Sequence, residues 1–360
     1  MVLKIAVERR DMYFLVILWT ALASGFCQVS DDKFSFCGGF SRLISSVFGG
    51  VDPNLKYMLF TRSNAQDACD LQPTEEAFRT CNFNPNRKTA IIVHGWIPKL
   101  QTNSPVFTIK DKLLQVDDYN VVVFNWTVYS NTYNYTSNVD INYNFAIVNS
   151  FYAALKLSSW MHFLQIHGAN TNYFHLINHS LGCVLTHLAV QPLCNIRHIT
   201  YLDAAGPRFK SILRFLRPSN TDAYFVEAIH TNGAISEKEG EGLIPPIADI
   251  DYYPNGGQLQ PKCVKGARFR TETGEIDTVT SQSKKNSCNH NLSFFYYIAS
   301  FNKTCQFLGR ICDSYEDFNA GKCSSAPVCR MGFYSKKLPN LPAHSKCYLK
   351  TSAEFPYCLD

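Results

Sequence analysis

The residues best suited to covalent chemistry lie in one short segment, Phe174-His-Leu-Ile-Asn-His-Ser-Leu-Gly182. The segment predicts a buried strand that ends at Ser180 and leads into a helix, with a glycine two residues after the serine. On such a tight turn a serine hydroxyl is exposed beside a base, and the amides that follow face a developing oxyanion. A match of this length arises by chance, and the first glycine of a G-x-S-x-G motif is missing. The nucleophile hypothesis therefore depends on other residues.

Three further groups follow predicted strands in an order that suits acyl transfer. His94, Gly95 and Trp96 end an earlier strand, and amides in such a turn are typical of an oxyanion hole. Asp203 ends the strand after the Ser180 helix, and His290 comes later, which gives the chain order Ser, Asp, His. The carboxyl ends of parallel strands meet at one edge of a sheet, so these side chains are expected to converge there.

The elements that must position these residues alternate between strands and helices. Buried strands are predicted from continuous β-branched runs, and helices from apolar residues at helical spacing. The predicted strands are 89–93, 120–124, 173–177, 199–202 and 224–229, and the predicted helices are 145–164 and 181–190. This alternation predicts an α/β fold whose central sheet is mostly parallel and has helices on both faces. The polar stretch 127–144 is predicted to be an exposed, glycosylated loop.

Composition limits the class of protein. The chain has 360 residues, of which 46% are hydrophobic and 14% aromatic, so it can bury a sizeable core and is not disordered or collagen-like. Its 34 basic and 29 acidic residues give a net charge of +5, which does not predict nucleic acid as a partner. Its 14 cysteines raise the question of export to an oxidising compartment.

The N-terminal sequence has the pattern of a signal peptide, which predicts export. Lys4, Arg9 and Arg10 precede an apolar run at 12–23 and then small residues. This pattern predicts a secretory signal peptide at 1–25 and a secreted, extracellular domain at 26–360. The run is short for a bilayer span, and no other stretch approaches 18 apolar residues, so no transmembrane segment is expected after cleavage. No CxxC pair or zinc-finger spacing occurs, so no metal is predicted.

Glycosylation sequons support an exported protein. Glycans are predicted at Asn125, Asn134, Asn291 and Asn302. A fifth sequon, at Asn178, lies at a buried strand end and is expected to stay unmodified.

Taken together, the motifs resemble the pancreatic lipase family over about residues 55–335. The matching stretches are HGW (94–96), HSLG (179–182), LDAAGPRF (202–209), DAYFVEAIHT (222–231), DYYPNGGQLQPKC (251–263) and CNH (288–290). The resemblance implies an α/β-hydrolase fold with Ser180 as nucleophile and His290 as general base and then acid. It also implies that Asp203 orients His290, and that the backbone amides of Trp96 and Leu181 bind the oxyanion.

The same resemblance implies part of the disulfide pattern. It makes Cys263–Cys288 the base of a lid at 263–288, and spacing with resemblance suggests Cys312–Cys323 and Cys69–Cys81. The segment 305–360 is a cysteine-rich end whose other pairings stay open. Cys183, in the first turn of the helix after Ser180, is predicted to be a buried free thiol that lies too far from Cys194 to bridge.

Several of these residues also have a purely structural interpretation. His94, His179 and His230 are each consistent with packed, hydrogen-bonded core histidines. Asp203 alone suits a turn, and His290 alone suits a helix start, but both in register with Ser180 favour catalysis.

The chain departs from the family pattern near the nucleophile. Asn178 stands where the family has glycine, and Cys183 and Ala204 replace alanine and proline. A Cβ at position 178 takes space in the turn, so the hypothesis is that Asn178 lowers the rate modestly. Of the family's calcium-binding loop only Asp222 is matched, so no metal is assigned.

These observations predict a secreted serine lipase that hydrolyses acyl esters of glycerolipids at a lipid interface without a cofactor. The length of the lid and of the stretch 231–249 favours triacylglycerol. The alternative is a phospholipase A1 with the same site, because the ending 353–358 resembles the arthropod branch and the chain ends at Asp360 without room for a β-sandwich. A second alternative is a silent lipid-binding or storage protein on the same scaffold, although such relatives lose the nucleophile that is present here.

Overall fold

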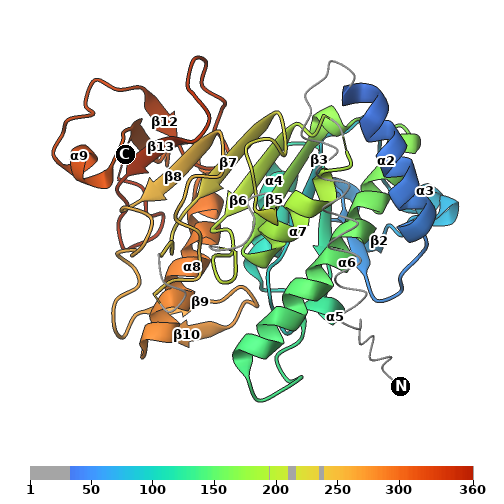
Figure 1. Cartoon of the computed structure of the whole chain (residues 1–360), viewed down its shortest axis with the longest axis horizontal. Coiled ribbons are helices and arrows are strands. Elements are labelled where there is room, and N and C mark those ends of the chain that lie inside the picture. The colour runs from blue at the N-terminus through green and yellow to red at the C-terminus, as the bar shows by residue number, and fades with distance from the viewer. Residues whose placement is uncertain (1–32, 194, 210–215, 235–238, 360) are drawn as a thin grey trace.

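The computed structural model describes residues 33–193, 195–209, 216–234 and 239–359 (Figure 1). The predicted signal peptide and Cys194 lie outside these ranges. The described residues form an 11-stranded sheet in the order β12-β11-β13-β8-β7-β6-β5-β3-β4-β1-β2. Its strands are β1 (Lys56–Phe60), β2 (Cys69–Asp70), β3 (Thr89–Val93), β4 (Asn120–Asn125), β5 (Phe174–His179), β6 (His198–Leu202), β7 (Phe225–Ile229), β8 (Ile250–Pro254), β11 (Leu308–Ile311), β12 (Val328–Arg330) and β13 (Ser345–Leu349).

The middle of this sheet is parallel, from β4 through β3, β5, β6, β7 and β8 to β13. Strands β1 and β2 at one edge, and β11 and β12 at the other, are antiparallel to their neighbours. Strands β3 and β5 are buried along their whole length because helices cover both faces, which explains their continuous apolar sequences. The predicted α/β class is therefore confirmed.

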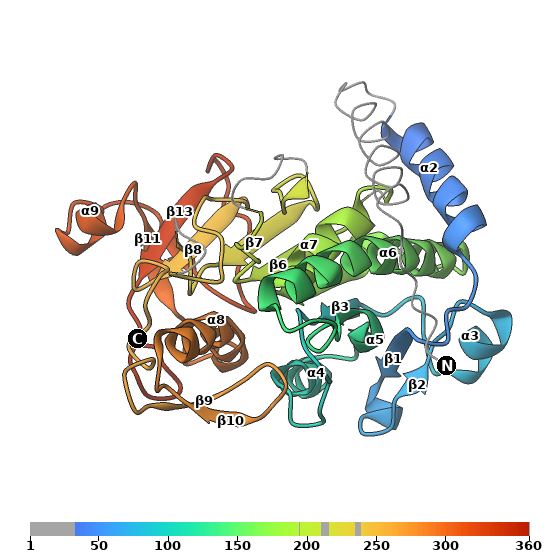
Figure 2. The same cartoon turned by 60° about the horizontal axis from the view of Figure 1, so that its bottom comes forward.

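Helices cover the two faces in separate groups. The helices are α2 (Lys33–Phe48), α3 (Glu75–Thr80), α4 (Pro105–Val116), α5 (Thr127–Ser130), α6 (Val139–Ile166), α7 (Leu181–Val190), α8 (Gln282–Ala299) and α9 (Tyr315–Asn319), with single 3-10 turns at Arg62–Asn64 and Thr171–Tyr173. Helices α6, α7 and α2 lie on one face and α4 and α8 on the other (Figure 2). None of the described helices, the 28-residue α6 included, is long and apolar enough to cross a membrane.

The predicted loop at 127–144 is wrong in part. It contains α5, and α6 begins at Val139, before the predicted start at 145. The side chain of Asn138 caps this helix by accepting hydrogen bonds from the amides of Asp140 and Ile141. The first turns alternate apolar and polar residues, and Val139 and Ile141 face solvent, so no apolar helical face marks this start.

Four of the five described disulfide bonds tie the C-terminal half of the chain. The described disulfides are Cys69–Cys81, Cys263–Cys288, Cys305–Cys358, Cys312–Cys323 and Cys329–Cys347. The segment between Cys263 and Cys288 carries its own two-stranded hairpin, β9 (Arg268–Arg270) and β10 (Ile276–Thr278), next to α8. Cys183 is buried and unpaired, and burial raises the pKa of its thiol.

Candidate active site

Ser180 occupies a sharp turn between β5 and α7. Its φ of 53° and ψ of −124° lie in a region that non-glycine residues rarely adopt, which marks a strained turn. The amides of Cys183 and Ala205 both donate to the Ser180 carbonyl and hold the turn. A Cβ at Gly182 would lie 2.6 Å from the carbonyl oxygen of His94, so only glycine lets α7 approach the end of β3 this closely. The sequence-predicted elbow is thus built from a strained serine and a glycine.

Asp203 follows β6 and holds the imidazole of His290. Its Oδ2 accepts from His290 Nδ1 at 2.6 Å, and its Oδ1 accepts from the amides of Thr231 at 2.7 Å and Asn232 at 3.0 Å. Asp203 is 1% exposed, so these three donors compensate its burial. A hydrogen bond to Nδ1 directs the Nε2 lone pair outward, which is the tautomer that a general base needs.

Trp96 is fixed by the loop after α5. Its indole Nε1 donates to Thr132 Oγ1 at 2.9 Å, and Tyr133 stacks on its ring at 4.1 Å. The hydroxyl of Tyr133 donates to the Trp96 carbonyl at 2.8 Å. Neither the Trp96 amide nor the Leu181 amide donates a hydrogen bond to another described residue. Two rigid, unused amides beside a strained serine can bind an oxyanion.

Glu272, from the hairpin between Cys263 and Cys288, reaches this loop. Its Oε1 accepts from the Gly95 amide at 2.7 Å, and its Oε2 lies 2.9 Å from His179 Nδ1. A Cβ at Gly95 would lie 2.8 Å from the Cβ of Ser180 and 3.1 Å from Glu272 Oε2, which places this carboxylate close to the serine. Burial raises the pKa of Glu272, but His179 and His94 outweigh burial and lower it. An ionised carboxylate therefore lies beside the candidate oxyanion hole.

A second carboxylate faces the outer nitrogen of His290. Glu241 Oε2 lies 3.9 Å from His290 Nε2. The Ser180 hydroxyl makes no hydrogen bond within the described chain. Burial lowers the pKa of His290, but the hydrogen bond to Asp203 and the charges of Glu241, Asp203 and Glu272 raise it to about 9. Glu241 is half-buried, and this burial raises its own pKa. The resting site therefore favours a protonated imidazole.

Asn178 is accommodated in the elbow by hydrogen bonds. Its Oδ1 accepts from Thr186 Oγ1 at 2.6 Å, and its Nδ2 donates to the Thr200 carbonyl at 3.4 Å. The positive φ of the turn belongs to Ser180, so Asn178 carries no left-handed strain. Thr186 therefore satisfies the polar atom that replaces the family's glycine.

The remaining histidines near the site are held by packing and hydrogen bonds. His230 is buried, stacks on Tyr253 and pairs with Asp251 at 2.8 Å. His94 accepts from the Trp126 amide and stacks on its ring. Both histidines therefore have structural hydrogen-bond and stacking partners, as the sequence allowed.

Asp222, the single match to the family's calcium loop, already has four donors. Its oxygens accept from His187 Nδ1 at 2.9 Å, Tyr201 Oη at 2.7 Å, Gln191 Nε2 at 2.8 Å and the Ser219 amide at 2.8 Å. These contacts tie α7 to β6 and account for the buried charge.

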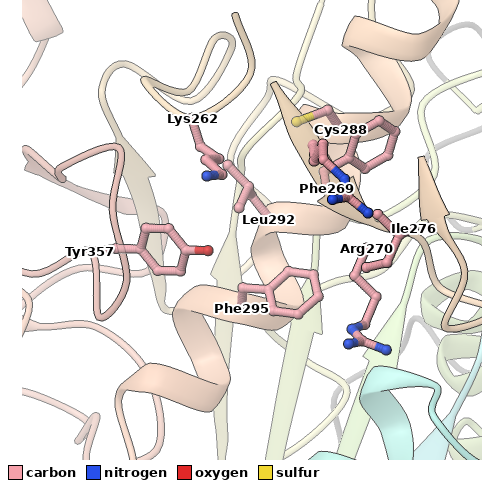
Figure 3. A pocket seen from close by; sticks show the side chains of 9 residues that line it. Lys262, Phe269, Arg270, Ile276, Cys288, Leu292, Phe295 and Tyr357 are labelled. Atoms are coloured by element: carbon pink, nitrogen blue, oxygen red, sulfur yellow. The ribbon is translucent and has the colours of Figure 1, made fainter. Parts of the chain in front are cut away.

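A hollow among the described residues lies away from Ser180 (Figure 3). It measures about 400 Å³ and lies between the β9–β10 hairpin, α8 and the C-terminal segment. Its lining consists of Lys262, Arg268, Phe269, Arg270, Ile276, Cys288, Leu292, Phe295 and Tyr357. Ser180 is not among them, so this hollow is not the space in front of the serine.

The structure brings the sequence-predicted residues together at the carboxyl edge of the parallel strands. Trp96 follows β3, Ser180 follows β5 and Asp203 follows β6, with His290 on α8 bonded to Asp203. Sequence reasoning missed Glu241 and Glu272, which lie in irregular connections where no periodicity or motif marks a residue.

Strand order and the serine elbow define the class as an α/β hydrolase. The profile of the family described as Lipase matches residues 41–357. The chain is 30% identical over 350 residues to lipase member H of Oryctolagus cuniculus, covering 92% of this chain and 70% of that protein. It is 32% identical over 295 residues to pancreatic triacylglycerol lipase of Homo sapiens, covering 80% and 61%. The chain belongs to the lipase family and is a carboxylic ester hydrolase.

Among solved structures, an alpha/beta hydrolase enzyme named MGS-M1, from a deep-sea metagenome library, is 14% identical with a TM-score of 0.28. The matched region covers 51% of this chain and 72% of that enzyme. A likeness this weak carries no argument about function.

Proposed function

We propose that this protein is a secreted serine lipase that hydrolyses acyl esters of glycerolipids through Ser180, His290 and Asp203. The observation that carries the proposal is the buried Asp203–His290 hydrogen bond of 2.6 Å at the same sheet edge as the strained Ser180 turn. Ser180 attacks the acyl carbonyl while His290 Nε2 takes its proton. The amides of Trp96 and Leu181 bind the oxyanion, His290 returns the proton to the leaving alcohol, and water then releases the fatty acid.

Triacylglycerol is the proposed first substrate, and phospholipid is the alternative. The intervening chain between Cys263 and Cys288 is long for the phospholipase pattern, and one relative is named pancreatic triacylglycerol lipase. The direct test is fatty-acid release from emulsified triolein and from phosphatidylcholine vesicles, with Ser180→Ala as control. Release mainly from triolein supports the proposal, whereas release mainly from phosphatidylcholine supports the phospholipase alternative. Equal background for wild type and the alanine variant would leave only the silent lipid-binding protein.

The disulfide bonds and the exposed glycosylation sequons support the proposal that the protein is exported. Five disulfides in the described chain favour an oxidising compartment, so we propose that 1–25 is removed as a signal peptide. Asn134 and Asn302 are exposed and stay proposed glycan sites, and Asn125 is partly exposed. Asn291 is only 5% exposed and its Nδ2 donates to the Ser287 carbonyl within α8, so its burial argues against the predicted glycan.

We further propose that 263–288 is a lid held shut by Glu272. The disulfide at its base restricts the unfolded chain by roughly 3 kcal/mol in the loop-entropy picture. Glu272 ties the hairpin to Gly95, and Ser104 Oγ also donates to the Glu272 carbonyl. A carboxylate in this position opposes an oxyanion, so the lid must leave with its charge before the acyl ester reacts.

Replacing Glu272 by glutamine is expected to raise the rate on a soluble short-chain ester several-fold, because the latch loses its charge. The rate on emulsified triolein is expected to stay within about twofold, since the interface already opens the lid. Glu275→Gln is the matched control, because Glu275 lies in the same hairpin but pairs at the surface with Lys99. Equal losses on both substrates would instead mean that Glu272 holds Gly95 in its productive position.

The pKa of His290 predicts an alkaline enzyme. A general base must be neutral, so kcat/KM is expected to rise with pH and reach half its maximum near pH 9. Glu241→Gln removes a charge that stabilises the protonated ring, so the half-maximum is expected to move down by about one pH unit. The exposed Glu239 provides a neighbouring control, Glu239→Gln, which should leave the profile in place. An unchanged profile in the Glu241 variant would contradict this electrostatic picture.

A further inference from the structure

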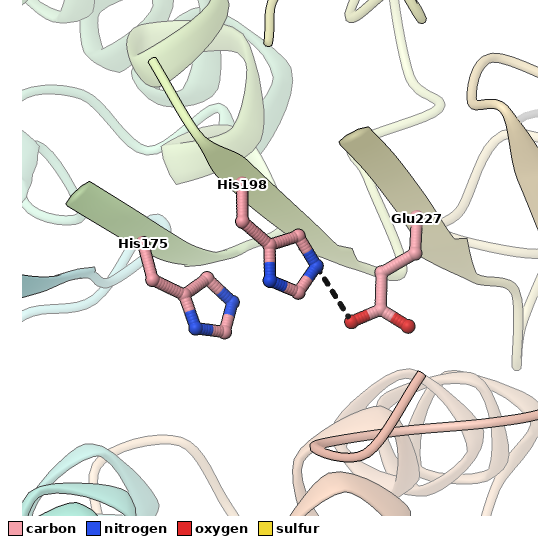
Figure 4. A group of neighbouring side chains, drawn as sticks. All are labelled: His175, His198 and Glu227. Atoms are coloured by element: carbon pink, nitrogen blue, oxygen red, sulfur yellow. Dashed lines mark ion pairs between the residues drawn. The ribbon is translucent and has the colours of Figure 1, made fainter. Parts of the chain in front are cut away.

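Three potential metal ligands meet on the central strands, away from the catalytic edge (Figure 4). His175 and His198 are cross-strand neighbours on β5 and β6, and Thr200 is the neighbour of Glu227 on β7. The three ligands and Thr200 have their side chains on the same sheet face, which α4 and α8 cover. Figure 4 shows both imidazoles and the carboxylate extending from their strands to the same side of the sheet.

This group leaves buried polar atoms without hydrogen bonds. His198 Nε2 lies 3.3 Å from Glu227 Oε1, and neither this nitrogen nor Glu227 Oε2 makes a hydrogen bond of good geometry, although Ser335 and the Gly332 amide lie near the carboxylate. The hydroxyl of Tyr297, on α8, also lacks a hydrogen bond of good geometry, and it lies near both Thr200 and the charge of Glu227. Glu227 and Tyr297 are fully buried. Each such atom costs about 1–3 kcal/mol, so a cluster of them on an apolar face needs a partner.

The atoms that are bonded form a short chain within the same group. His175 Nε2 lies 2.8 Å from Thr200 Oγ1, which donates to Glu227 Oε1 at 2.8 Å. The two imidazole rings stack with 3.9 Å between centroids and 11° between planes. This stacking places the two imidazoles side by side, so that a nitrogen of each ring can face the same ion.

We propose that His175, His198 and Glu227 form a zinc site. One ligand atom from each residue lies within 4.8 Å of the other two. Tetrahedral zinc, with bonds of about 2.0–2.2 Å, holds its ligands roughly 3.4 Å apart. Tilting the rings toward each other provides this contraction and releases His175 from Thr200. Two histidines and one glutamate are a known zinc set with an open fourth position, and the carboxylate offsets part of the metal's charge.

The position of the site indicates a structural role. His198 begins β6 and Asp203 follows its end, so the two residues are separated by roughly 16 Å along the strand. An ion at His198 would therefore touch no catalytic group and would join three neighbouring strands. The His198 side chain is 16% exposed, which gives the metal an entry path that the two other ligands lack.

The test uses the full secreted protein without a purification tag, stripped with a chelator and then dialysed against zinc. We expect one zinc per chain by elemental analysis and a rise in Tm of at least about 3 °C on zinc addition. Cobalt substitution is expected to give the intense visible bands of a four-coordinate site, a readout independent of stability and activity.

Two ligand variants and one control variant test which residues bind the zinc. His198→Gln and the isosteric Glu227→Gln are both expected to lose the bound zinc, the Tm rise and the cobalt bands. His167→Gln is the matched control, because His167 pairs with Glu75 at the surface at 2.8 Å and the described residues place no third ligand beside this pair. Absence of stoichiometric zinc in the wild type, or its retention in both variants, would overturn the proposal.

Discussion

Replacing Ser180 by alanine is expected to lower kcat for ester hydrolysis by roughly 10⁴-fold or more, as loss of a serine nucleophile does in other hydrolases. The variant loses the only hydroxyl on the strained turn between β5 and α7. Alanine keeps the Cβ, so the hydrogen bonds from the Cys183 and Ala205 amides to the residue 180 carbonyl remain. The measurement is fatty-acid release from triolein under conditions in which wild type is linear with time.

A surface serine serves as the control for this variant. Ser324 is exposed on the C-terminal segment, and Ser324→Ala should retain full activity. Both variants should keep the wild-type Tm within about 2 °C, because neither removes a buried hydrogen-bonded group. Retention of more than about one hundredth of wild-type kcat by the Ser180 variant would show that another group attacks the ester.

Asp203→Asn is expected to lower kcat by about 10⁴-fold while KM changes little. The asparagine Oδ1 can still accept from the amides of Thr231 and Asn232. Its Nδ2 then faces His290 Nδ1 as a donor, so the ring proton moves to Nε2. In that tautomer His290 cannot take the proton of Ser180, although the fold is kept.

The chain contains its own comparison for this second variant. Asp251 pairs with His230 at 2.8 Å and accepts from the amides of Ile247 and Ala248, a buried arrangement similar to that of Asp203. Asp251→Asn should lower the Tm but leave kcat within a few-fold. If both variants lost activity equally, the Asp203 effect would reflect stability and the catalytic assignment would fail.

The parallel core was predictable from sequence because its chemistry is local and repetitive. Strand Thr89–Val93 and helix Leu181–Val190 have the predicted bounds, since each is a continuous apolar run next to a turn. The start of α6 at Val139 was missed because its first turns alternate apolar and polar residues and its cap, Asn138, resembles a loop residue. The short antiparallel strands at both edges of the sheet carry too few residues for a period to emerge.

Near the site, the residues that belong to a sequence motif could be predicted, whereas the residues that tertiary packing brings in could not. Ser180 and Asp203 each follow a recognisable strand, so their place at one sheet edge follows from the topology, whereas His290 joins Asp203 from the middle of α8. Glu272 and Glu241 reach the site from long connections whose path depends on tertiary packing. The pairing of His175, His198 and Glu227 likewise needs the register of three strands, which no single segment specifies. Asn178 shows a related limit, since its partner Thr186 lies two helical turns further on.

The most direct test of Ser180 as nucleophile is labelling of the purified protein with a fluorophosphonate, followed by digestion and mass spectrometry. A covalent phosphonyl adduct should form on Ser180 with one label per chain, and it should be lost in Ser180→Ala and strongly slowed in Asp203→Asn. An unlabelled wild type that is folded and disulfide-bonded, or an adduct on a different residue, would contradict the proposed mechanism.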